Sequence, residues 1–273
     1  MIAILVYAHK NKEQVQRLIN ALKNENVDIY VHADKKFQVD KFENAVMIED
    51  RYDVKWGDPS IINSIISSLK EIRKNKIYDY YILLSGQDYP IVSMDKVVKF
   101  LNDNKGKEFI EFKKVGTGKN EWNVSNRYTY YHFYNNDFLD KVSRHVYNKR
   151  SFINNWIPYG GALWWTLTDA AIKYIIETYE DLKLYNKIKG TLCMDEIIFQ
   201  SILCNSKFKD KIVNKAYRYI DWSDHIAGKN NGNPNTLVVK DYDKIVSSGD
   251  FFARKFDINT DAKILNMLDE VRK

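Results

Sequence analysis

The sequence is poor in cysteine and proline, and each shortage excludes a class of protein. Its 273 residues include 2 cysteines, 4 prolines and 11 glycines. Cys193 and Cys204 flank a predicted helix, whose length of about eleven residues separates them by roughly 16 Å, too far for a disulfide. Neither cysteine has a histidine or second cysteine at metal-ligand spacing. The low proline and moderate glycine content argues against a long disordered region.

The sequence also lacks a long hydrophobic run. No stretch of about 18 apolar residues occurs, so no membrane-spanning helix is expected. The opening segment MIAILVYAHK lacks the basic flank and cleavage site of a signal peptide. We therefore expect a soluble, cytoplasmic protein, with a position at the inner face of the membrane left open. The formal net charge of +6 fits an anionic small molecule, an anionic membrane surface or nucleic acid, and does not choose among them.

Strands and helices alternate over the first 110 residues. Apolar runs predict strands at residues 2–7, 27–32, 45–49 and 80–85, and helical spacing predicts helices at 15–22 and from Asp58-Pro59 to residue 72. A strand, a helix and a strand within about thirty residues form a βαβ unit, which requires parallel pairing. The pattern predicts an α/β fold with a mostly parallel central sheet flanked by helices.

The second half of the chain is less regular. Residues 113–157 are rich in Tyr, Asn, Lys and Arg and show no clear period. Further on, the patterns predict helices at 168–179, 195–203 and 261–271, a strand at 216–222 and a loop at 227–235. We see no linker and no internal repeat, so we expect a single domain over residues 1–273.

Polar residues follow three of the predicted strands. They are YAHK (7–10), HADKK (32–36) and SGQDYP (85–90). In open α/β sheets, ligands bind at the carboxyl ends of the strands. Residues 1 to about 110 therefore look like a nucleotide-binding half.

Eight segments, taken together, resemble a known family. They occur in register over residues 2 to 257, nearly the whole chain. In order they are ILVYAHKNKEQVQRLINAL, IYVHADKK, VKWGDPSII, DYYILLSGQDYPI, YGGALWWTL, MDEIIFQSIL, RYIDW and FFARKFD. The family is that of the core-2/I-branching β-1,6-N-acetylglucosaminyltransferases and the related peptide O-xylosyltransferases.

The resemblance implies a GT-A-like fold and an inverting, metal-independent sugar transfer from a UDP-sugar to a hydroxyl. N-acetylglucosamine and xylose are the donor sugars it suggests, and residues from about 111 to 273 become the acceptor-binding and catalytic half. Eukaryotic relatives are anchored Golgi enzymes with several disulfides, which this chain lacks. It looks more like a bacterial member that builds a surface polysaccharide or glycolipid. The expected partners are a UDP-sugar and a glycan or lipid-linked glycan, with no nucleic acid and no cofactor.

An inverting transfer needs a base that takes the acceptor's proton as the acceptor oxygen attacks the anomeric carbon. The family's base is the glutamate of its Asp-Glu pair, which corresponds to Glu196 in MDEIIF. Asp195 is expected to cap the helix and position its neighbour. The alternative for Glu196 is an acid favoured in the first turn of a helix by the helix dipole alone.

The leaving nucleotide diphosphate needs stabilisation of its negative charge. In the family the lysine of the FFARKFD motif contacts the pyrophosphate, which assigns Lys255 to that role and Arg254 to a supporting one. The alternative is a pair of charges on a solvated face. Lys240 and Arg218 are weaker candidates for the same task.

The resemblance places uridine against the end of the first strand and the acid after the second, which are Val6 and Asp34. Asp34 is alternatively a turn-capping residue. Asp88, in SGQDYP, stands where metal-dependent relatives carry an Asp-X-Asp pair. As a lone acid it is a poor metal site, so it either bonds donor hydroxyls or fixes the loop.

Other candidates are aromatic or ionisable. Trp222 in RYIDW matches a tryptophan near the family's acceptor site, and sugar faces stack on indole rings. Of Trp164 and Trp165, one is expected in the core and the other, which we take as Trp165, at the acceptor. His9 and His32 are either structural or ligand contacts, and the DYD string at 241–243 is interpreted as a helix start.

Three rival interpretations remain at this point. The first is a metal-dependent glycosyltransferase of another GT-A family. The second is a nucleic-acid-binding protein, although the basic residues are spread along the chain and no binding motif occurs. The third is an inactive protein that binds a sugar nucleotide. The basic chain would assist docking on an anionic bilayer if the acceptor were lipid-linked, but no amphipathic anchor is obvious.

Overall fold

The computed structural model describes residues 1–133, 137–147, 149–223 and 233–272. The chain forms two compact units, and each is assembled from separate segments. Unit 1 comprises Met1–Ile48, Tyr80–Lys105 and Lys215–Lys273, and unit 2 comprises Glu49–Asp79 and Gly106–Asn214. The loop predicted at 227–235 lies mostly outside the described residues. The single-domain organisation and the roles expected for residues on either side of position 110 stay predictions.

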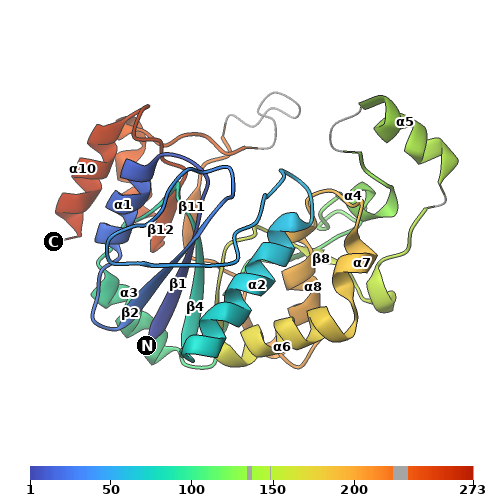
Figure 1. Cartoon of the computed structure of the whole chain (residues 1–273), viewed down its shortest axis with the longest axis horizontal. Coiled ribbons are helices and arrows are strands. Elements are labelled where there is room, and N and C mark those ends of the chain that lie inside the picture. Colours follow the sequence, from blue (N-terminus) through green and yellow to red (C-terminus); the bar gives the residue numbers. More distant parts are fainter. Residues whose placement is uncertain (134–136, 148, 224–232, 273) are drawn as a thin grey trace. The chain divides into compact units, whose positions relative to one another are not determined.

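Unit 1 is built on a parallel sheet. Strands β1 (Ile2–Ala8), β2 (Val27–Ala33), β3 (Val46–Met47) and β4 (Tyr80–Ser85) lie in the order β4-β1-β2-β3, and every pair is parallel. All residues of β1 and β4 are buried, because both faces of a parallel sheet are covered. Helices α1 (Lys12–Ala21), α3 (Met94–Asp103) and α10 (Ala262–Val271) lie beside these strands (Figure 1).

A second, smaller sheet in unit 1 pairs a strand of the SGQDYP motif with a strand of the FFARKFD motif. Its order is β11 (Arg218–Ile220), β12 (Phe252–Arg254) and β5 (Asp88–Pro90). The β11–β12 pair is parallel and the β12–β5 pair is antiparallel, with Arg254 opposite Asp88. Helix α9 (Tyr242–Ser247) precedes β12. The strand expected at 216–222 is therefore confirmed in a shorter form.

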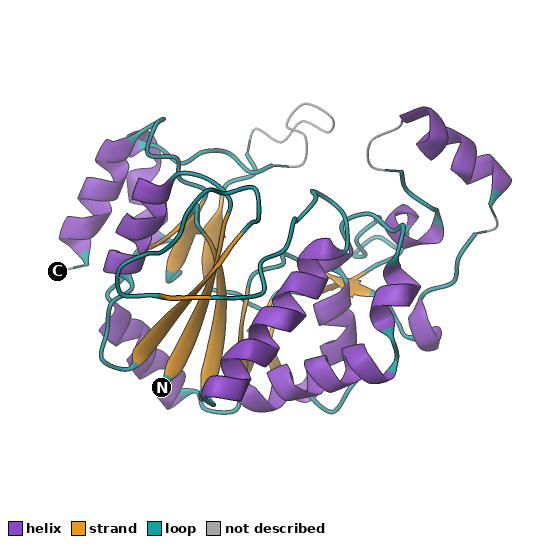
Figure 2. Ribbon diagram, in the orientation of Figure 1, coloured by secondary structure: helices purple, strands orange, loops and turns teal. Residues whose placement is uncertain are grey.

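Unit 2 combines a small mixed sheet with a group of helices. Strands β10 (Ile212–Val213), β6 (Glu108–Ile110) and β9 (Trp165–Thr168) lie in that order, and β7 (Lys113–Lys114) pairs with β8 (Tyr159–Gly160). The helices are α2 (Ser60–Asn75), α4 (Asn126–Thr129), α5 (Asp137–Val146), α6 (Asp169–Asp181), α7 (Leu184–Ile188) and α8 (Ile198–Cys204). Short 3₁₀ turns occur at η1 (Ile153–Asn155), η2 (Met194–Glu196) and η3 (Lys209–Lys211), and η4 (Val239–Asp241) belongs to unit 1. Figure 2 shows the helices and strands of each unit by colour.

The predicted α/β class with a mostly parallel sheet is confirmed. Two boundaries differ from expectation. The helix predicted from Asp58 begins at Ser60, and the Asp58 carboxylate accepts a bond of 2.8 Å from the Ser60 N–H. The helix predicted from Asp195 begins at Ile198, because residues 194–196 form a 3₁₀ turn. Residues 113–157, which showed no period, contain α4 and α5.

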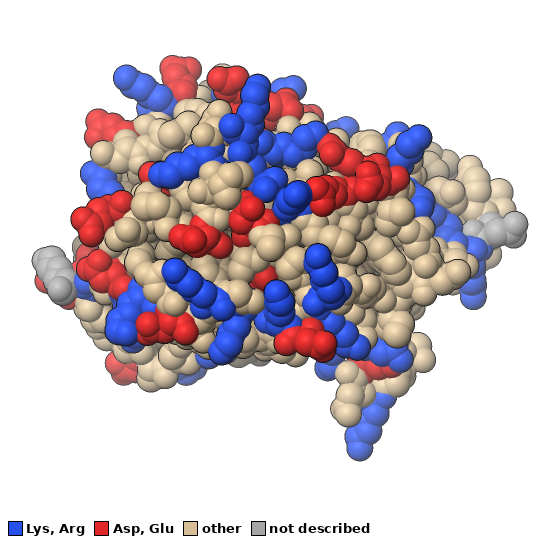
Figure 3. All heavy atoms as spheres, turned by 90° about the horizontal axis from the view of Figure 1, so that it is seen from below, with Lys and Arg blue, Asp and Glu red and all other residues tan. Residues whose placement is uncertain are grey.

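Charged side chains of both signs are spread over the surface. On the face drawn in Figure 3, Lys and Arg side chains alternate with Asp and Glu side chains. Acids close to bases weaken the summed field that draws a polyanion to a protein. Within the described ranges, no helix combines the length and the apolar composition needed to cross a bilayer.

Candidate functional site

The candidate residues form two clusters, one in each unit, and each cluster is described by itself. In unit 1, three cations gather after β1 and at the end of β12; we call Lys10, Arg254 and Lys255 the cation cluster. Burial lowers the pKa of Lys255, and the charges of Arg254 and Lys10 lower it further, while Asp257 opposes them. Lys10 also bonds the Asp257 carboxylate at 2.8 Å. Cations crowded in this way bind an anion more strongly than isolated surface lysines do.

His9 lies within the electrostatic influence of the cation cluster. Its pKa is lowered by burial and by Lys10, Lys255 and Arg254, and raised in part by Asp34. The neutral imidazole is therefore favoured, and it can donate one hydrogen bond and accept another. His32 is different, because it is fully buried and its ring stacks on Tyr7 with a centroid separation of 4.6 Å. Burial and stacking favour a structural role for His32 over a contact with ligand.

A buried glutamine in α1 fixes the segment that carries Lys255. The Nε2 of Gln14 donates to the backbone oxygens of Gly86 and Phe256, both at 3.0 Å, and its Oε1 accepts from the Ile258 N–H at 2.8 Å. The Phe256 N–H donates to the Gln87 oxygen at 2.9 Å. The SGQDYP turn and the FFARKFD motif are therefore bound to each other and to α1, which limits the movement of Lys255.

Gly86 permits this arrangement. A Cβ at this position would lie 2.9 Å from a methyl group of Val15 in α1, closer than real Cβ atoms approach. The Gly86 N–H also donates to the Tyr7 oxygen at 2.7 Å, so the turn continues directly from the sheet. Any larger residue here would push the turn away from α1.

Asp88 is enclosed by protein donors. Its Oδ2 accepts from the Ser85 N–H at 2.6 Å and from the Ser85 hydroxyl at 2.5 Å, and its Oδ1 accepts from the Arg218 guanidinium. The Arg254 Nε lies 3.8 Å from Oδ2. The Asp88 and Arg218 side chains are 0% and 1% exposed. This geometry supports the loop-fixing alternative for Asp88, and a contact with the donor sugar stays a prediction.

Two further residues predicted to bind the UDP-sugar, Val6 and Asp34, differ in where they lie. Val6 lies inside β1, between Val31 and Leu84, and is fully buried, so it offers no exposed atom to a nucleotide. Asp34 follows β2 and its Oδ1 accepts from the Lys36 N–H at 2.8 Å, which is a turn cap. Contact of either residue with uridine stays a prediction.

Trp222 is the exposed aromatic candidate of unit 1. It follows β11 and is 43% exposed. Its neighbour Asp221 accepts from the Ser223 N–H at 2.9 Å and from the Asn235 amide at 3.0 Å, which fixes the backbone on either side of the indole. An indole held this way can present a face to a sugar ring. The acceptor role of Trp222 stays a prediction.

In unit 2, Glu196 lies at the centre of a second cluster. Its Oε2 accepts from the Arg127 Nη1 at 2.5 Å, and the guanidinium of Arg127 stacks on the Trp122 indole at 4.8 Å from the ring centroid. Glu196 lies in the η2 turn, two residues before α8 begins at Ile198, so the alternative of an acid favoured by the helix dipole stays open. The carboxylate is partly exposed, and one planar cation holds it in a fixed orientation.

The glycine pair before β9 brings the backbone against this cluster. The Gly161 N–H donates to the Glu196 backbone oxygen at 2.9 Å. A Cβ on Gly160 would lie 2.7 Å from the Trp122 ring and 2.9 Å from that same oxygen, and a Cβ on Gly161 would lie 2.2 Å from the Glu111 oxygen. The close approach therefore requires glycine at both positions. This explains the small-residue turn in YGGALWWTL.

Asp195 does not cap a helix as predicted, because η2 and α8 begin without a side-chain cap. Burial and the adjacent Glu196 charge raise the pKa of Asp195 to about 7.

We expect Asp195→Asn to stabilise the protein at pH 8. Because the folded-state pKa of Asp195 is raised from 3.8 to about 7, the folded state binds more protons than the unfolded state between these values, and stability falls as pH rises through this window. Asparagine does not ionise and escapes this loss. The gain should be at least about 1 kcal/mol at pH 8 and smaller at pH 5. Urea unfolding at both pH values measures it, and an equal gain at both would contradict the raised pKa.

Trp165 is placed in the core and not at a surface. It is 1% exposed, lies on β9 and packs against Phe199 with a centroid separation of 6.0 Å. Trp164 is also buried. An enclosed ring offers no face to a sugar, so the structure gives no support to an acceptor role for Trp165. Trp122 and Arg127, which the sequence did not single out, are the aromatic and the cation beside Glu196.

No metal site is visible among the described residues. Within residues 1–133, 137–147, 149–223 and 233–272, no group of three or more His, Cys, Asp or Glu side chains is arranged to hold an ion. Asp241 of the DYD string accepts from the Val238 N–H at 3.0 Å and belongs to the η4 turn before α9, as expected of a helix start. Metal-independent catalysis stays a prediction.

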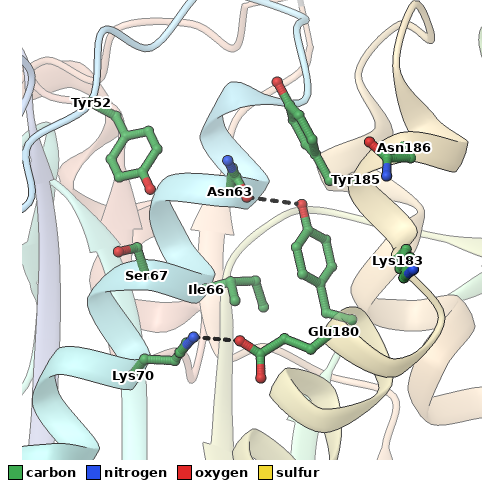
Figure 4. Close-up of a pocket in the computed structure, with 10 residues that line it drawn as sticks. Tyr52, Asn63, Ile66, Ser67, Lys70, Glu180, Lys183, Tyr185 and Asn186 are labelled. Atoms are coloured by element: carbon green, nitrogen blue, oxygen red, sulfur yellow. Dashed lines mark hydrogen bonds and ion pairs between the residues drawn. The ribbon is translucent and has the colours of Figure 1, made fainter.

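Unit 2 also contains a pocket of about 330 Å³ where α2, α6 and α7 approach one another (Figure 4). Lys70 of α2 pairs with Glu180 of α6, and the Tyr179 hydroxyl donates to the Asn63 oxygen at 3.3 Å. These bonds join α2 to α6. None of the predicted site residues lines this pocket.

Comparison with known proteins decides the family. A sequence model described as Core-2/I-Branching enzyme matches residues 2–246. The chain belongs to this family of glycosyltransferases. The resemblance drawn from the eight segments is confirmed.

Named relatives of this Core-2/I-branching family member are xylosyltransferases. Xylosyltransferase 2 of Rattus norvegicus is 25% identical over 300 residues, which cover 98% of this chain and 33% of the relative. Xylosyltransferase oxt of Drosophila melanogaster is 24% identical, over 94% of this chain and 32% of the relative. The chain therefore spans about a third of the length of these relatives. Among solved structures, residues 1–349 of S. aureus TarS match with a TM-score of 0.38 and 13% identity, covering 77% of this chain and 56% of that one.

Proposed function

We propose that this protein is an inverting glycosyltransferase that moves a sugar from a UDP-sugar to a hydroxyl of a glycan or glycolipid acceptor, without a metal. The carboxylate of Glu196, held by Arg127 beside the Trp122 indole, is the observation that carries the proposal. N-acetylglucosamine and xylose are the proposed sugars, and the xylosyltransferase relatives favour xylose. The acceptor belongs to surface polysaccharide or glycolipid synthesis, at the inner face of the membrane.

The proposed reaction is one in-line displacement. The acceptor oxygen attacks the anomeric carbon, its proton passes to the Glu196 carboxylate, and the bond from the anomeric carbon to the diphosphate oxygen breaks with its electron pair leaving on UDP. Arg127 is a positioning residue, because it contacts the base and not the reacting atoms. Trp122 and Trp222, one in each unit, are proposed to stack against a sugar face.

The cation cluster of unit 1 is proposed to stabilise the leaving diphosphate. Lys255 is half-buried and its pKa is lowered by burial and by Arg254 and Lys10, so a bound dianion would relieve repulsion among these cations. Arg254 is held in turn by the Asp88–Arg218 pair below it. Fixed cations of this kind can supply the charge that a divalent ion supplies in other transferases.

We expect UDP to raise the melting temperature of the protein in the presence of EDTA. A ligand at about 100 times its Kd adds about 2.7 kcal/mol to the free energy of unfolding. Lys255→Gln should abolish most of this rise, because it removes one of the three cations of the cluster, the one proposed to contact the diphosphate. Differential scanning fluorimetry with UDP and a panel of nucleotide sugars measures both effects.

The matched control is Lys263→Gln, which removes an exposed lysine at the start of α10 in the same unit. It should leave the UDP response unchanged. A response that requires Mn²⁺ would favour a metal-dependent transferase of another type. No response to any nucleotide would overturn the proposal, and an undiminished response in Lys255→Gln would overturn the role of Lys255.

A further inference from the structure

Helix α5 (Asp137–Val146) in unit 2 exposes its apolar residues. We call Phe138, Leu139, Val142 and Val146 the α5 face. Phe138 is 73% exposed and Val146 69%, and the other two are also exposed. Since each helical residue advances by 100°, positions 138, 142 and 146 fall within an arc of about 80°. The α5 face is therefore a continuous apolar stripe on the outside of the helix.

The polar residues Asp140 and Ser143 of α5 are turned inward. Ser143 is buried, and its hydroxyl donates to the Tyr131 oxygen at 2.7 Å and to the Asp140 oxygen at 2.8 Å. Asp140 is half-buried, accepts from the Phe133 N–H at 3.2 Å and lies 3.2 Å from the Nδ1 of buried His132. A helix on the surface of a water-soluble domain normally buries its apolar side. In α5 this arrangement is reversed, so water is not the medium that the α5 face fits.

The surroundings of the α5 face are aromatic and basic. The exposed rings of Tyr131 and Tyr147 flank the helix, with centroids 5.0 Å apart, and Arg150 stacks on Tyr131 at 4.7 Å. Lys141, on α5, and Lys149, three residues after the end of α5, are exposed. Tyrosine and basic residues beside an apolar stripe are the composition that lies at the boundary between lipid headgroups and acyl chains.

We propose that α5 is a membrane-docking helix, which inserts the α5 face into the headgroup–acyl boundary of an anionic bilayer. Apolar burial supplies insertion, and Lys141 and Lys149 supply attraction to anionic headgroups. A second copy of the chain is the competing occupant of the α5 face, and the oligomeric state tests it below. The inference does not depend on which sugar is transferred.

The test is flotation of the purified chain with lipid vesicles, without any nucleotide. The vesicles are pure phosphatidylcholine, or phosphatidylcholine mixed with phosphatidylglycerol. The wild-type chain should bind the mixed vesicles, and the triple variant Phe138→Ser, Val142→Ser, Val146→Ser should bind them at least about tenfold more weakly. Because these side chains are exposed, the melting temperature of the variant should match that of the wild type.

The matched control is the double variant Ile77→Ser, Val271→Ser, which removes exposed apolar side chains outside α5 and should bind as the wild type does. A second variant, Lys141→Gln, Lys149→Gln, should lose about fivefold per lysine on mixed vesicles. No wild-type binding, or equal loss in the triple and control variants, would overturn the proposal. So would binding that is equal on both vesicle types.

The oligomeric state gives an independent outcome. If light scattering shows a dimer without lipid, and the triple variant is a monomer, a second copy covers the α5 face and membrane docking is overturned. A monomeric wild type that binds vesicles supports it. The UDP response of the melting temperature is measured separately, so loss of the proposed donor site and loss of membrane docking are distinguishable.

Discussion

Replacing Glu196 by glutamine is expected to reduce the rate of sugar transfer by about 10²- to 10⁴-fold, the usual contribution of a positioned general base. Glutamine keeps the size of the side chain and can still accept a hydrogen bond from Arg127, but it cannot take the acceptor's proton. The loss should appear in kcat, while the rise in melting temperature with UDP should persist, because the donor site proposed in unit 1 does not use Glu196. Product formation from a radiolabelled UDP-sugar measures the rate.

Glu177→Gln is the matched control, since it makes the same isosteric change at an exposed acid of α6 in unit 2. It should transfer sugar at the wild-type rate. A Glu196→Gln variant with an unchanged kcat would remove Glu196 from catalysis. Asp195, whose pKa is raised to about 7, would then be the nearest acid to examine.

The largest effect on stability is expected from Arg218→Met. Arg218 and Asp88 are a fully buried ion pair, and Arg218 also donates to the Leu83 oxygen at 3.1 Å. Removing the guanidinium leaves a buried carboxylate with a weaker set of partners, the Ser85 donors and the more distant Arg254. Breaking a buried pair in this way costs about 3–5 kcal/mol. Urea denaturation at constant pH measures the loss.

Arg73→Met provides the contrast. Arg73 likewise pairs with a carboxylate. Its Nε and Nη2 donate to the two carboxylate oxygens of Asp169 at 2.7 and 3.1 Å, but this pair is partly exposed. Water can replace the lost bond, so the cost should be about 1 kcal/mol or less. A double-mutant cycle with Asp88→Asn isolates the coupling. Equal losses in Arg218→Met and Arg73→Met would show that burial does not govern the strength of the Asp88 pair.

The parallel strands of unit 1 were predictable because a strand buried on both faces consists almost entirely of apolar residues. In β1 and β4 every residue is buried, so the sequence is an apolar run that ends at a polar turn. Element boundaries were less predictable where the local conformation is irregular. Cys193 adopts a left-handed conformation with φ of 48°, which starts the η2 turn and delays α8 to Ile198. No pattern of side chains predicts a left-handed backbone conformation at a cysteine.

The candidate site was predictable only where one residue type carries the chemistry. Glu196 and Lys255 were named from their motifs, and their roles in the reaction stay predictions. Arg127 could not be named in this way. Its proposed role depends on contact with Glu196, 69 positions further along the chain, and the segment around Arg127 shows no hydrophobic periodicity. Trp165 failed for a related reason. Two adjacent tryptophans look alike in sequence, and β9 buries both of them.

The interleaved segments of unit 1 have a consequence for how the chain is made. Gln14, near the start, is bonded to Phe256 and Ile258, near the end, so this part of the unit closes only after residue 258 has been synthesised. Contacts so distant along the chain form late and slowly. Until then the apolar strands β1, β2 and β4 lack the segment that completes their surroundings, and a growing chain with such strands is prone to aggregate. We expect the nascent protein to depend on chaperone protection until the segment that contains Phe256 and Ile258 has emerged.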